Sequence, residues 1–154
     1  MDGKLQFELV SPERLLVDQP VGMVVVPGTE GNFGVLPGHA LFISTVRPGI
    51  IDVYADGMPT ITERIFISGG FAEVTPERCT VLADEAEPLS TLDRAQIEGE
   101  ARNLESTVAG LKDQAQRASD NDREEIQVEL LVAERRLAVA QAKLAALAAA
   151  TSGH

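Results

Sequence analysis

The chain has 154 residues, a hydrophobic fraction of 44% and a formal net charge of −11, which suits one domain or a small domain with an appendage. The acidic excess is spread along the chain with no basic block, so a nucleic acid is excluded as a partner because its phosphates would repel this surface. No apolar run approaches the roughly 20 residues of a membrane-spanning helix, and the N-terminal segment does not resemble a signal peptide.

The composition changes sharply at Pro88. All eight prolines and all six Phe and Tyr residues lie at or before this position. Beyond it there are fourteen alanines, no proline and no aromatic residue. This contrast predicts two domains with different architectures, one over residues 1–88 and one over residues 89–154.

The first domain shows the patterns of short β-strands. Leu5, Phe7 and Leu9 alternate with polar residues, as in a strand with one buried face. Asp56-Gly57 predicts a tight hairpin, and other turn residues recur every eight to twelve positions. Cys79, the only cysteine, is expected to be an inert buried thiol in a reducing compartment. We therefore predict an antiparallel β-sandwich. Its strands are expected over residues 5–9, 23–26, 42–46, 51–55, 61–67, 71–74 and 80–83.

Gly28, Gly31 and Gly34 recur at every third position within the first domain. This spacing predicts a tight surface loop that uses positive φ angles. A phosphate-binding loop is disfavoured because no Gly-Lys-Ser/Thr follows and no helix is predicted there. An exposed loop on a rigid sandwich often binds a partner, and we expect this one to be a contact surface.

The second domain shows two apolar stripes with the alternating four- and three-residue steps of a coiled-coil seam. The polar segment 119–122 separates them, and Asn121 with Glu124 predicts a capping box at the start of the second helix. A short polar linker between matching stripes predicts an antiparallel α-helical hairpin. The stripes consist of Ile97, Ala101, Leu104, Val108, Leu111, Ala115 and Ala118, and of Ile126, Leu130, Ala133, Leu137, Ala140, Leu144 and Leu147.

Side chains that could work together in catalysis are scarce. His39 stands in a turn with no second His or Cys nearby, so a metal site is not expected, and a structural role is favoured over catalysis. No nucleophile elbow or catalytic triad is present. The residues alone therefore predict an interaction module that is not an enzyme and that requires no cofactor or metal.

Two stretches of the first domain carry a family resemblance. GTEGNFGVLPGHALFISTVRPG, over residues 28–49, and ISGGFAEVTPERCTVLADEAE, over residues 67–87, resemble segments of the epsilon-type subunits of F-type ATP synthases, called delta in mitochondria. The order of sandwich and hairpin and the total length are also similar to this family. The resemblance covers almost the whole chain.

The resemblance implies a non-catalytic subunit of the central stalk, the rotor of the proton-translocating enzyme. Its partners would be the gamma subunit, the ring of membrane c subunits and the catalytic alpha/beta head. The loop over residues 28–34 would contact the c-ring through Glu30 and Asn32, with His39 near the same end. The subunit would lie on the cytoplasmic face of the bacterial inner membrane, peripheral to it through the ring.

The resemblance also implies a regulatory hairpin that extends into the head and slows ATP hydrolysis. Its candidate contacts are Arg135, Arg136 and Lys143, which are few enough to predict a weak brake. Some relatives bind ATP through Ile/Leu-Asp-x-x-Arg-Ala. Here Arg94 follows Asp93 directly and the motif is degenerate, so ATP binding is not expected. The alternatives are a free-standing scaffold or chaperone-like adaptor, or a nucleotide-sensing regulatory module.

Overall fold

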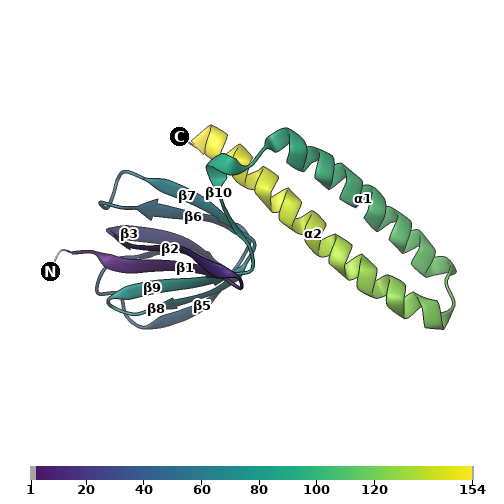
Figure 1. Ribbon diagram of the computed structural model, residues 1–154, viewed down its shortest axis with the longest axis horizontal. Coiled ribbons are helices and arrows are strands. Elements are labelled where there is room, and N and C mark those ends of the chain that lie inside the picture. Colours follow the sequence, from purple (N-terminus) through teal and green to yellow (C-terminus); the bar gives the residue numbers. More distant parts are fainter. Residues whose placement is uncertain (1–2, 154) are drawn as a thin grey trace. The chain divides into compact units, whose positions relative to one another are not determined.

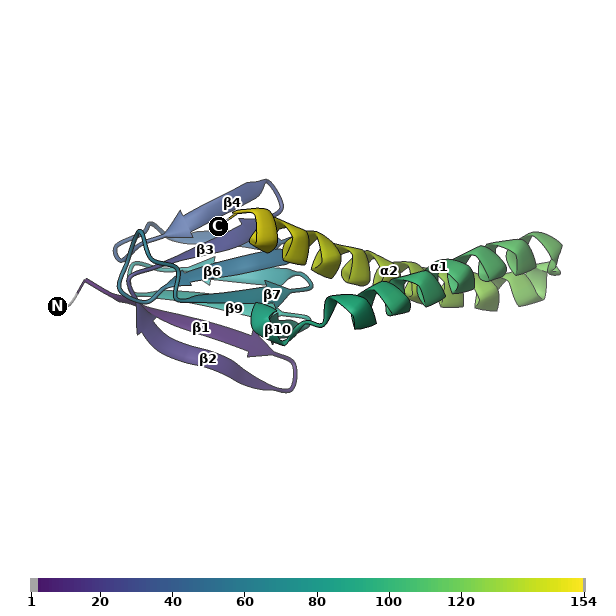
Figure 2. The same ribbon diagram turned by 90° about the horizontal axis from the view of Figure 1, so that it is seen from above.

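The computed structural model describes residues 3–153, with side chains to residue 150, and divides into two compact units, Met1–Thr91 and Leu92–His154. The first unit is a β-sandwich and the second is a pair of long helices (Figures 1 and 2). The predicted fold class, an antiparallel sandwich followed by an antiparallel helical hairpin, is confirmed.

The sandwich is a single sheet of ten strands that curls over, so that its two ends come opposite each other (Figure 1). The order across the sheet is β10-β7-β6-β3-β5-β8-β9-β1-β2, with β4 paired to β3 off this path. The strand pairs of the described residues are antiparallel except β1 with β9, which run parallel. The strands are β1 (Leu5–Ser11), β2 (Arg14–Val21), β3 (Met23–Gly28), β4 (Gly31–Val35), β5 (Phe42–Val46), β6 (Gly49–Tyr54), β7 (Glu63–Ile67), β8 (Gly70–Val74), β9 (Arg78–Ala83) and β10 (Ala86–Pro88), and a 3-10 turn, Leu89–Thr91, follows.

The glycine-rich segment differs from its prediction. Gly28 and Gly34 lie within β3 and β4, and of the three glycines only Gly31 has a positive φ, of 133°. The segment is therefore a β-hairpin in which Gly28 pairs with Gly31. The prediction of a loop failed because glycines have no side chain with which to show the alternation of a strand.

The connection between β6 and β7 is also longer than Asp56-Gly57 predicts. Pairing of the two strands ends at Val53 with Glu63, and residues 55–62 form the connection. Gly57 supplies the expected positive φ, of 88°. The tight hairpin is not formed because Pro59 has no N–H to donate to a strand ladder.

The core of the sandwich lies between the two halves of the curled sheet. Alternate residues of β1, β6, β8 and β9 point inward, as in β1, where Leu5, Phe7 and Leu9 are buried. Cys79 is also buried here. The fully buried side chains include Phe7, Phe66, Leu5, Leu9, Ile51, Ile67, Val21, Val24, Val26, Val35, Val53 and Val74.

The second unit consists of α1 (Arg94–Arg117) and α2 (Asp120–Gly153), joined by Ala118 and Ser119. The cap of α2 is Ser119, whose Oγ accepts the backbone N–H of Asp122 at 3.4 Å, and not Asn121 as predicted. Arg123 then donates to the backbone oxygens of Ala115 and Ala118 at 3.0 and 3.1 Å, which satisfies the end of α1. The predicted seam pairs the helices in two clusters. The buried members are Ile97, Ala101 and Ala140 in one, and Val108, Leu111 and Ala133 in the other.

Candidate functional site

The turn between β3 and β4, with the strand ends around it, forms an exposed tip of the sandwich. We call residues 28–34 the tip loop. Gly28 is required by crowding, because a Cβ at this position would lie 2.8 Å from the backbone oxygen of Gly31. Glu30 and Asn32 are both exposed, so the two predicted interface residues lie together on this tip.

The tip loop is fastened to the end of β5. Nη1 of Arg47 donates to the backbone oxygen of Gly28 at 2.6 Å, and Nη2 donates to Oδ1 of Asn32 at 2.7 Å. The hydroxyls of Thr29 and Thr45 lie 2.8 Å apart, and the backbone N–H of Thr29 donates to the oxygen of Thr45 at 3.1 Å. These bonds hold a polar loop in one conformation, which reduces the entropy lost on binding a partner.

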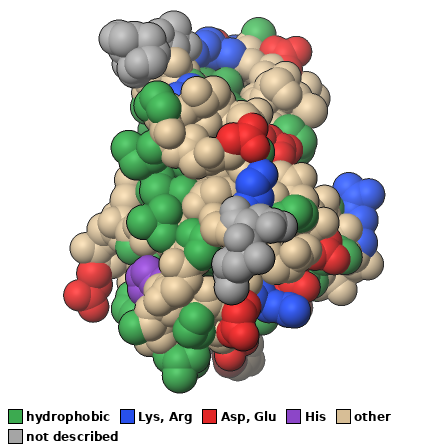
Figure 3. Space-filling view, turned by 90° about the vertical axis from the view of Figure 1, so that its left-hand side faces the viewer, with side chains coloured by type: hydrophobic (Ala, Val, Ile, Leu, Met, Phe, Trp, Pro, Cys, Tyr) green, Lys and Arg blue, Asp and Glu red, His purple; other side chains and the backbone are tan. Residues whose placement is uncertain are grey.

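His39 follows β4, five residues after the last residue of the tip loop. Its Nδ1 is 2.7 Å from the backbone oxygen of Ala40, and its ring centroid is 6.2 Å from that of Phe42. The ring of Phe42 in turn lies 5.1 Å, between centroids, from that of Phe33 in the tip loop, and the expectation that His39 lies near this end stays a prediction. In Figure 3 the one described histidine is bordered by hydrophobic side chains. His39 thus has local partners among these apolar side chains.

A row of apolar side chains crosses the outer face of the sheet. Phe71 of β8 lies beside Leu82 of β9, which is paired with Val10 of β1, which in turn is paired with Leu15 of β2. Phe71, Leu82 and Leu15 are 55%, 53% and 55% exposed. We call these four residues the outer row. An ordered apolar row on a sheet face is typical of a protein–protein contact.

The outer row is not recognisable from the sequence alone. Each of its members lies on a different strand, and within each strand it looks like an isolated apolar residue on the solvent side. Only the register of β8, β9, β1 and β2 brings the four together. The one available signal was Phe71 itself, a large aromatic residue out of phase with the buried Ala72 and Val74.

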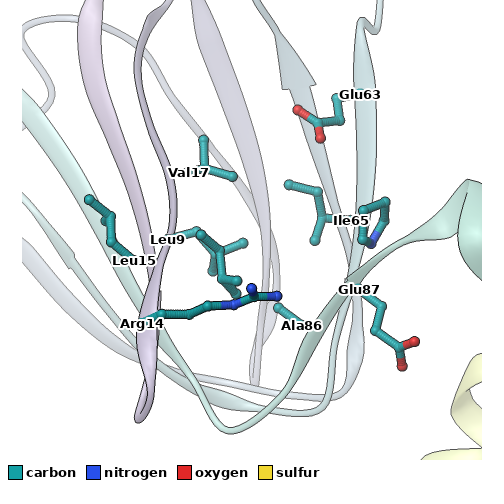
Figure 4. Close-up of a pocket in the computed structure, with 10 residues that line it drawn as sticks. Leu9, Arg14, Leu15, Val17, Glu63, Ile65, Ala86 and Glu87 are labelled. Carbon is teal, nitrogen blue, oxygen red and sulfur yellow. The ribbon is translucent and has the colours of Figure 1, made fainter.

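A cavity of about 280 Å³ lies at the seam where the two ends of the curled sheet meet. Figure 4 shows Arg14 of β2 extending toward Ala86, with Glu63 and Glu87 on the opposite side. The other walls are apolar, from Leu9, Leu15, Leu16, Val17, Ile65 and Pro88. No group of three or more potential metal-ligating side chains occurs among the described residues.

The residues of the degenerate nucleotide motif form the start of α1. Asp93 is the N-cap of this helix, and its Oδ1 accepts the backbone N–H of Gln96 at 3.3 Å. Arg94 begins the helix one residue later. The structure thus gives the carboxylate of Asp93 a role within the helix.

The predicted brake contacts lie on α2. Arg135 and Arg136 are exposed and Lys143 is half-buried. The same helix carries a second apolar group, outside the predicted seam. Val128 is 61% exposed and Leu131 65% exposed, so α2 has apolar side chains beyond those packed against α1.

Comparison with known proteins identifies relatives over most of the chain. Residues 4–89 match the family model described as "ATP synthase, Delta/Epsilon chain, beta-sandwich domain". The ATP synthase epsilon chain of Rhodospirillum centenum is 54% identical over 144 residues, which is 94% of this chain and 92% of that protein. The epsilon chain of Rhodospirillum rubrum is 48% identical over 128 residues, 83% of this chain and 94% of that protein.

A solved structure shares the fold. It is a chain of the Euglena gracilis mitochondrial ATP synthase, determined by cryo-EM as a complex of OSCP, F1 and c-ring. The TM-score is 0.58 at 24% identity, and the match covers 92% of this chain and 82% of that one.

Proposed function

The chain belongs to the ATP synthase delta/epsilon family, and we propose that it is the non-catalytic epsilon-type subunit of the central stalk, which joins the gamma subunit to the c-ring. The observation that carries this proposal is a pair of separate exposed surfaces, the tip loop and the outer row, on one closely packed sandwich. Two surfaces on a rigid body can transmit torque from one partner to the other.

The outer row is the proposed docking site of gamma. Its exposed apolar side chains lose water on contact with a partner, at about 25 cal/mol per Å² of apolar surface buried. An apolar centre surrounded by polar residues is the anatomy of a stable interface. Glu73 and Thr80, on the neighbouring cross-strand row of β8 and β9, supply such polar surroundings.

The tip loop is the proposed contact with the c-ring. It is polar and displays Glu30 and Asn32, which suits a contact with the polar loops of a membrane ring. Neither described helix is long and apolar enough to cross a membrane. We propose a peripheral location, reached through the ring, on the cytoplasmic face of the bacterial inner membrane.

The hairpin is the proposed regulatory element, which reaches the catalytic head when it extends. Arg135 and Arg136 would face acidic groups there, and the exposed Val128 and Leu131 would add apolar contact. Asp93 serves as a helix cap, which favours this mechanical function over a nucleotide-sensing one.

The proposal is tested on synthase from which this subunit has been removed. Full-length chain and a fragment ending at residue 91 are added back, and proton-driven ATP synthesis is measured. Both are expected to restore coupling, because the proposed gamma and ring contacts lie in the first unit. A folded fragment that binds neither gamma nor the ring would contradict this division of labour.

Substitutions in the outer row test the gamma contact directly. Leu82→Ser is expected to weaken binding to purified gamma about tenfold or more, since one buried leucine contributes about 1.5–3 kcal/mol. Met58→Ser is the matched control, because Met58 is 69% exposed but lies in the connection between β6 and β7. Equal affinities of the two variants would show that gamma docks elsewhere.

A further inference from the structure

We infer that Asn32 and Arg47 form a pair of hydrogen-bond donors that recognises an oxygen acceptor, either a carboxylate or a main-chain carbonyl, on the polar loop of the ring. The inference deepens the proposed ring contact and rests on it. It assigns Arg47 to an interface in which the family resemblance placed only Glu30 and Asn32.

The chemistry of Arg47 fixes the orientation of the Asn32 amide. A guanidinium carries N–H donors and no acceptor, so the amide atom 2.7 Å from Nη2 must be the oxygen. The Nδ2 group is on the other branch of the amide and is directed away from Arg47. Within the part of the chain that the structure describes, this NH₂ group has no acceptor.

Arg47 itself has donors to spare. Two of its five side-chain N–H groups bond to Gly28 and Asn32, and the others meet no acceptor in residues 3–153. Both of these acceptors are uncharged, and Glu30 makes no ion pair with Arg47 within the described residues. The tip therefore presents an exposed cation in a chain whose net charge is −11. An oxygen acceptor on the partner, above all a carboxylate, is the group that such a donor pair binds most strongly.

The loop is prepared for this contact before binding. The backbone N–H of Arg47 donates to the oxygen of Pro27 at 2.9 Å, so the side chain starts from a fixed point of the sheet. The bond to the oxygen of Gly28 then fixes the guanidinium plane beside the turn. Arg47 is thus a positioning residue for Asn32 as well as a donor in its own right.

Asn32→Asp separates recognition from structure. The carboxylate keeps the bond to Arg47 and strengthens it by adding charge, but it removes both outward N–H donors. The melting temperature is therefore expected to stay equal or rise, while binding to an oxygen acceptor weakens. A residue with a purely structural role would not move these two quantities in opposite directions.

The experiment uses the full chain, the purified gamma subunit, and gamma preassembled on the purified c-ring in detergent. The dissociation constant for gamma alone, divided by that for gamma on the ring, isolates the contribution of the ring. Asn32→Asp is expected to lower this ratio about tenfold without changing affinity for gamma alone, and Arg47→Gln is expected to lower it at least as much. Asn103→Asp is the matched control, because it makes the same change of charge at an exposed position of α1 and is expected to change neither constant.

An unchanged or raised ratio for Asn32→Asp would overturn the inference, since the ring would then bind a negatively charged side chain at this position at least as well as the amide. If the wild-type chain binds gamma equally well with and without the ring, the inference is also wrong while the gamma contact stands. If it binds neither preparation, the proposed function fails and the inference fails with it.

Discussion

The sandwich and the hairpin bury their apolar side chains in different ways. The sandwich encloses one continuous core, with side chains such as Phe7 and Ile51 fully removed from solvent. The hairpin has two small clusters, and half of their buried members are alanines, namely Ala101, Ala133 and Ala140. Apart from Leu111, the leucines packed on these clusters, such as Leu137, are only partly buried. The first unit is thus suited to carry load, and the second to open at a modest cost.

Substitution of one large buried side chain in each unit gives the largest expected effect. Phe7→Ala is expected to destabilise the sandwich by about 3–5 kcal/mol, because it leaves a cavity in a closed core. Leu111→Ala removes a buried side chain from a small cluster whose other walls are partly exposed, and about 2 kcal/mol is expected. Denaturant unfolding followed by Tyr54 fluorescence for the sandwich and by circular dichroism at 222 nm for the helices measures both.

The control for this comparison is Leu131→Ala on the exposed side of α2, for which a change within about 0.5 kcal/mol is expected. Leu111→Ala could also lower the denaturant midpoint of the sandwich, followed by Tyr54, as much as the midpoint of the helices. That result would contradict the description of two separately packed units.

Cys79 tests how well the sandwich core excludes water. Burial raises the pKa of its thiol to about 12, above the ordinary value of 9.0. Because the folded-state pKa is the higher one, the stabilising contribution is full below pH 9 and is lost as the pH rises toward 12, by about 1.4 kcal/mol per unit. The difference in unfolding free energy between wild type and Cys79→Ala, measured as a function of pH, isolates this contribution of the thiol. A difference that stays constant from pH 8 to pH 11 would mean that the thiol is hydrated.

Removal of residues 119–154 tests the hairpin as a brake. ATP hydrolysis by the complete synthase is expected to rise less than tenfold, which corresponds to less than about 1.4 kcal/mol of inhibition. Arg135, Arg136 and Lys143 are the predicted brake contacts on α2, and exposed ion pairs contribute about 0–1 kcal/mol each. A larger rise would show that the apolar face around Leu131 holds the head. The variant Leu131→Ser would then identify that contact.

The smallest expected effect is that of ATP on the isolated chain. Asp93 is occupied as the cap of α1, and Gln96 stands where the nucleotide motif requires arginine. Calorimetry is expected to show a dissociation constant weaker than about 0.1 mM, or no binding. A tighter constant that is lost in Arg94→Gln would restore the nucleotide-sensing alternative.

The spacing at which apolar residues repeat was the property of the sequence that predicted structure well. The two-residue alternation of β1 and the steps of four and three in the helices each identified their element. By contrast β2 has no regular alternation of buried and exposed residues, and β4 carries two glycines, so neither strand was predicted. The start of α2 was placed at Asn121 because several residues of the linker are good caps, and the one used depends on packing.

The candidate site could be predicted only in part from the sequence, for a different reason. Glu30 and Asn32 lie in a recognisable stretch, but Arg47 lies fifteen residues from Asn32 along the chain, and no local pattern links them. Their pairing depends on the hydrogen bond of Arg47 to Pro27 and on the place of β5 beside β3. Contacts set by the register of strands distant in sequence cannot be deduced from one sequence without knowledge of the sheet order.

The parallel pairing of β1 with β9 has a consequence for synthesis of the protein on the ribosome. Gln6 is paired with Arg78, and Val10 with Leu82. The first strand to be synthesised, β1, therefore has no β9 partner until almost the whole sandwich has been synthesised. Until the chain has been translated through Ala83 and has left the exit tunnel, β1 and β2 form a hairpin without its neighbour, with an apolar face uncovered. Such long-range closure is slow and exposes nascent chains to aggregation. The helices follow in translation and make contacts between near neighbours, so they complete their pairing quickly once released. The sandwich is the part of this subunit that is expected to need protection by a chaperone during translation.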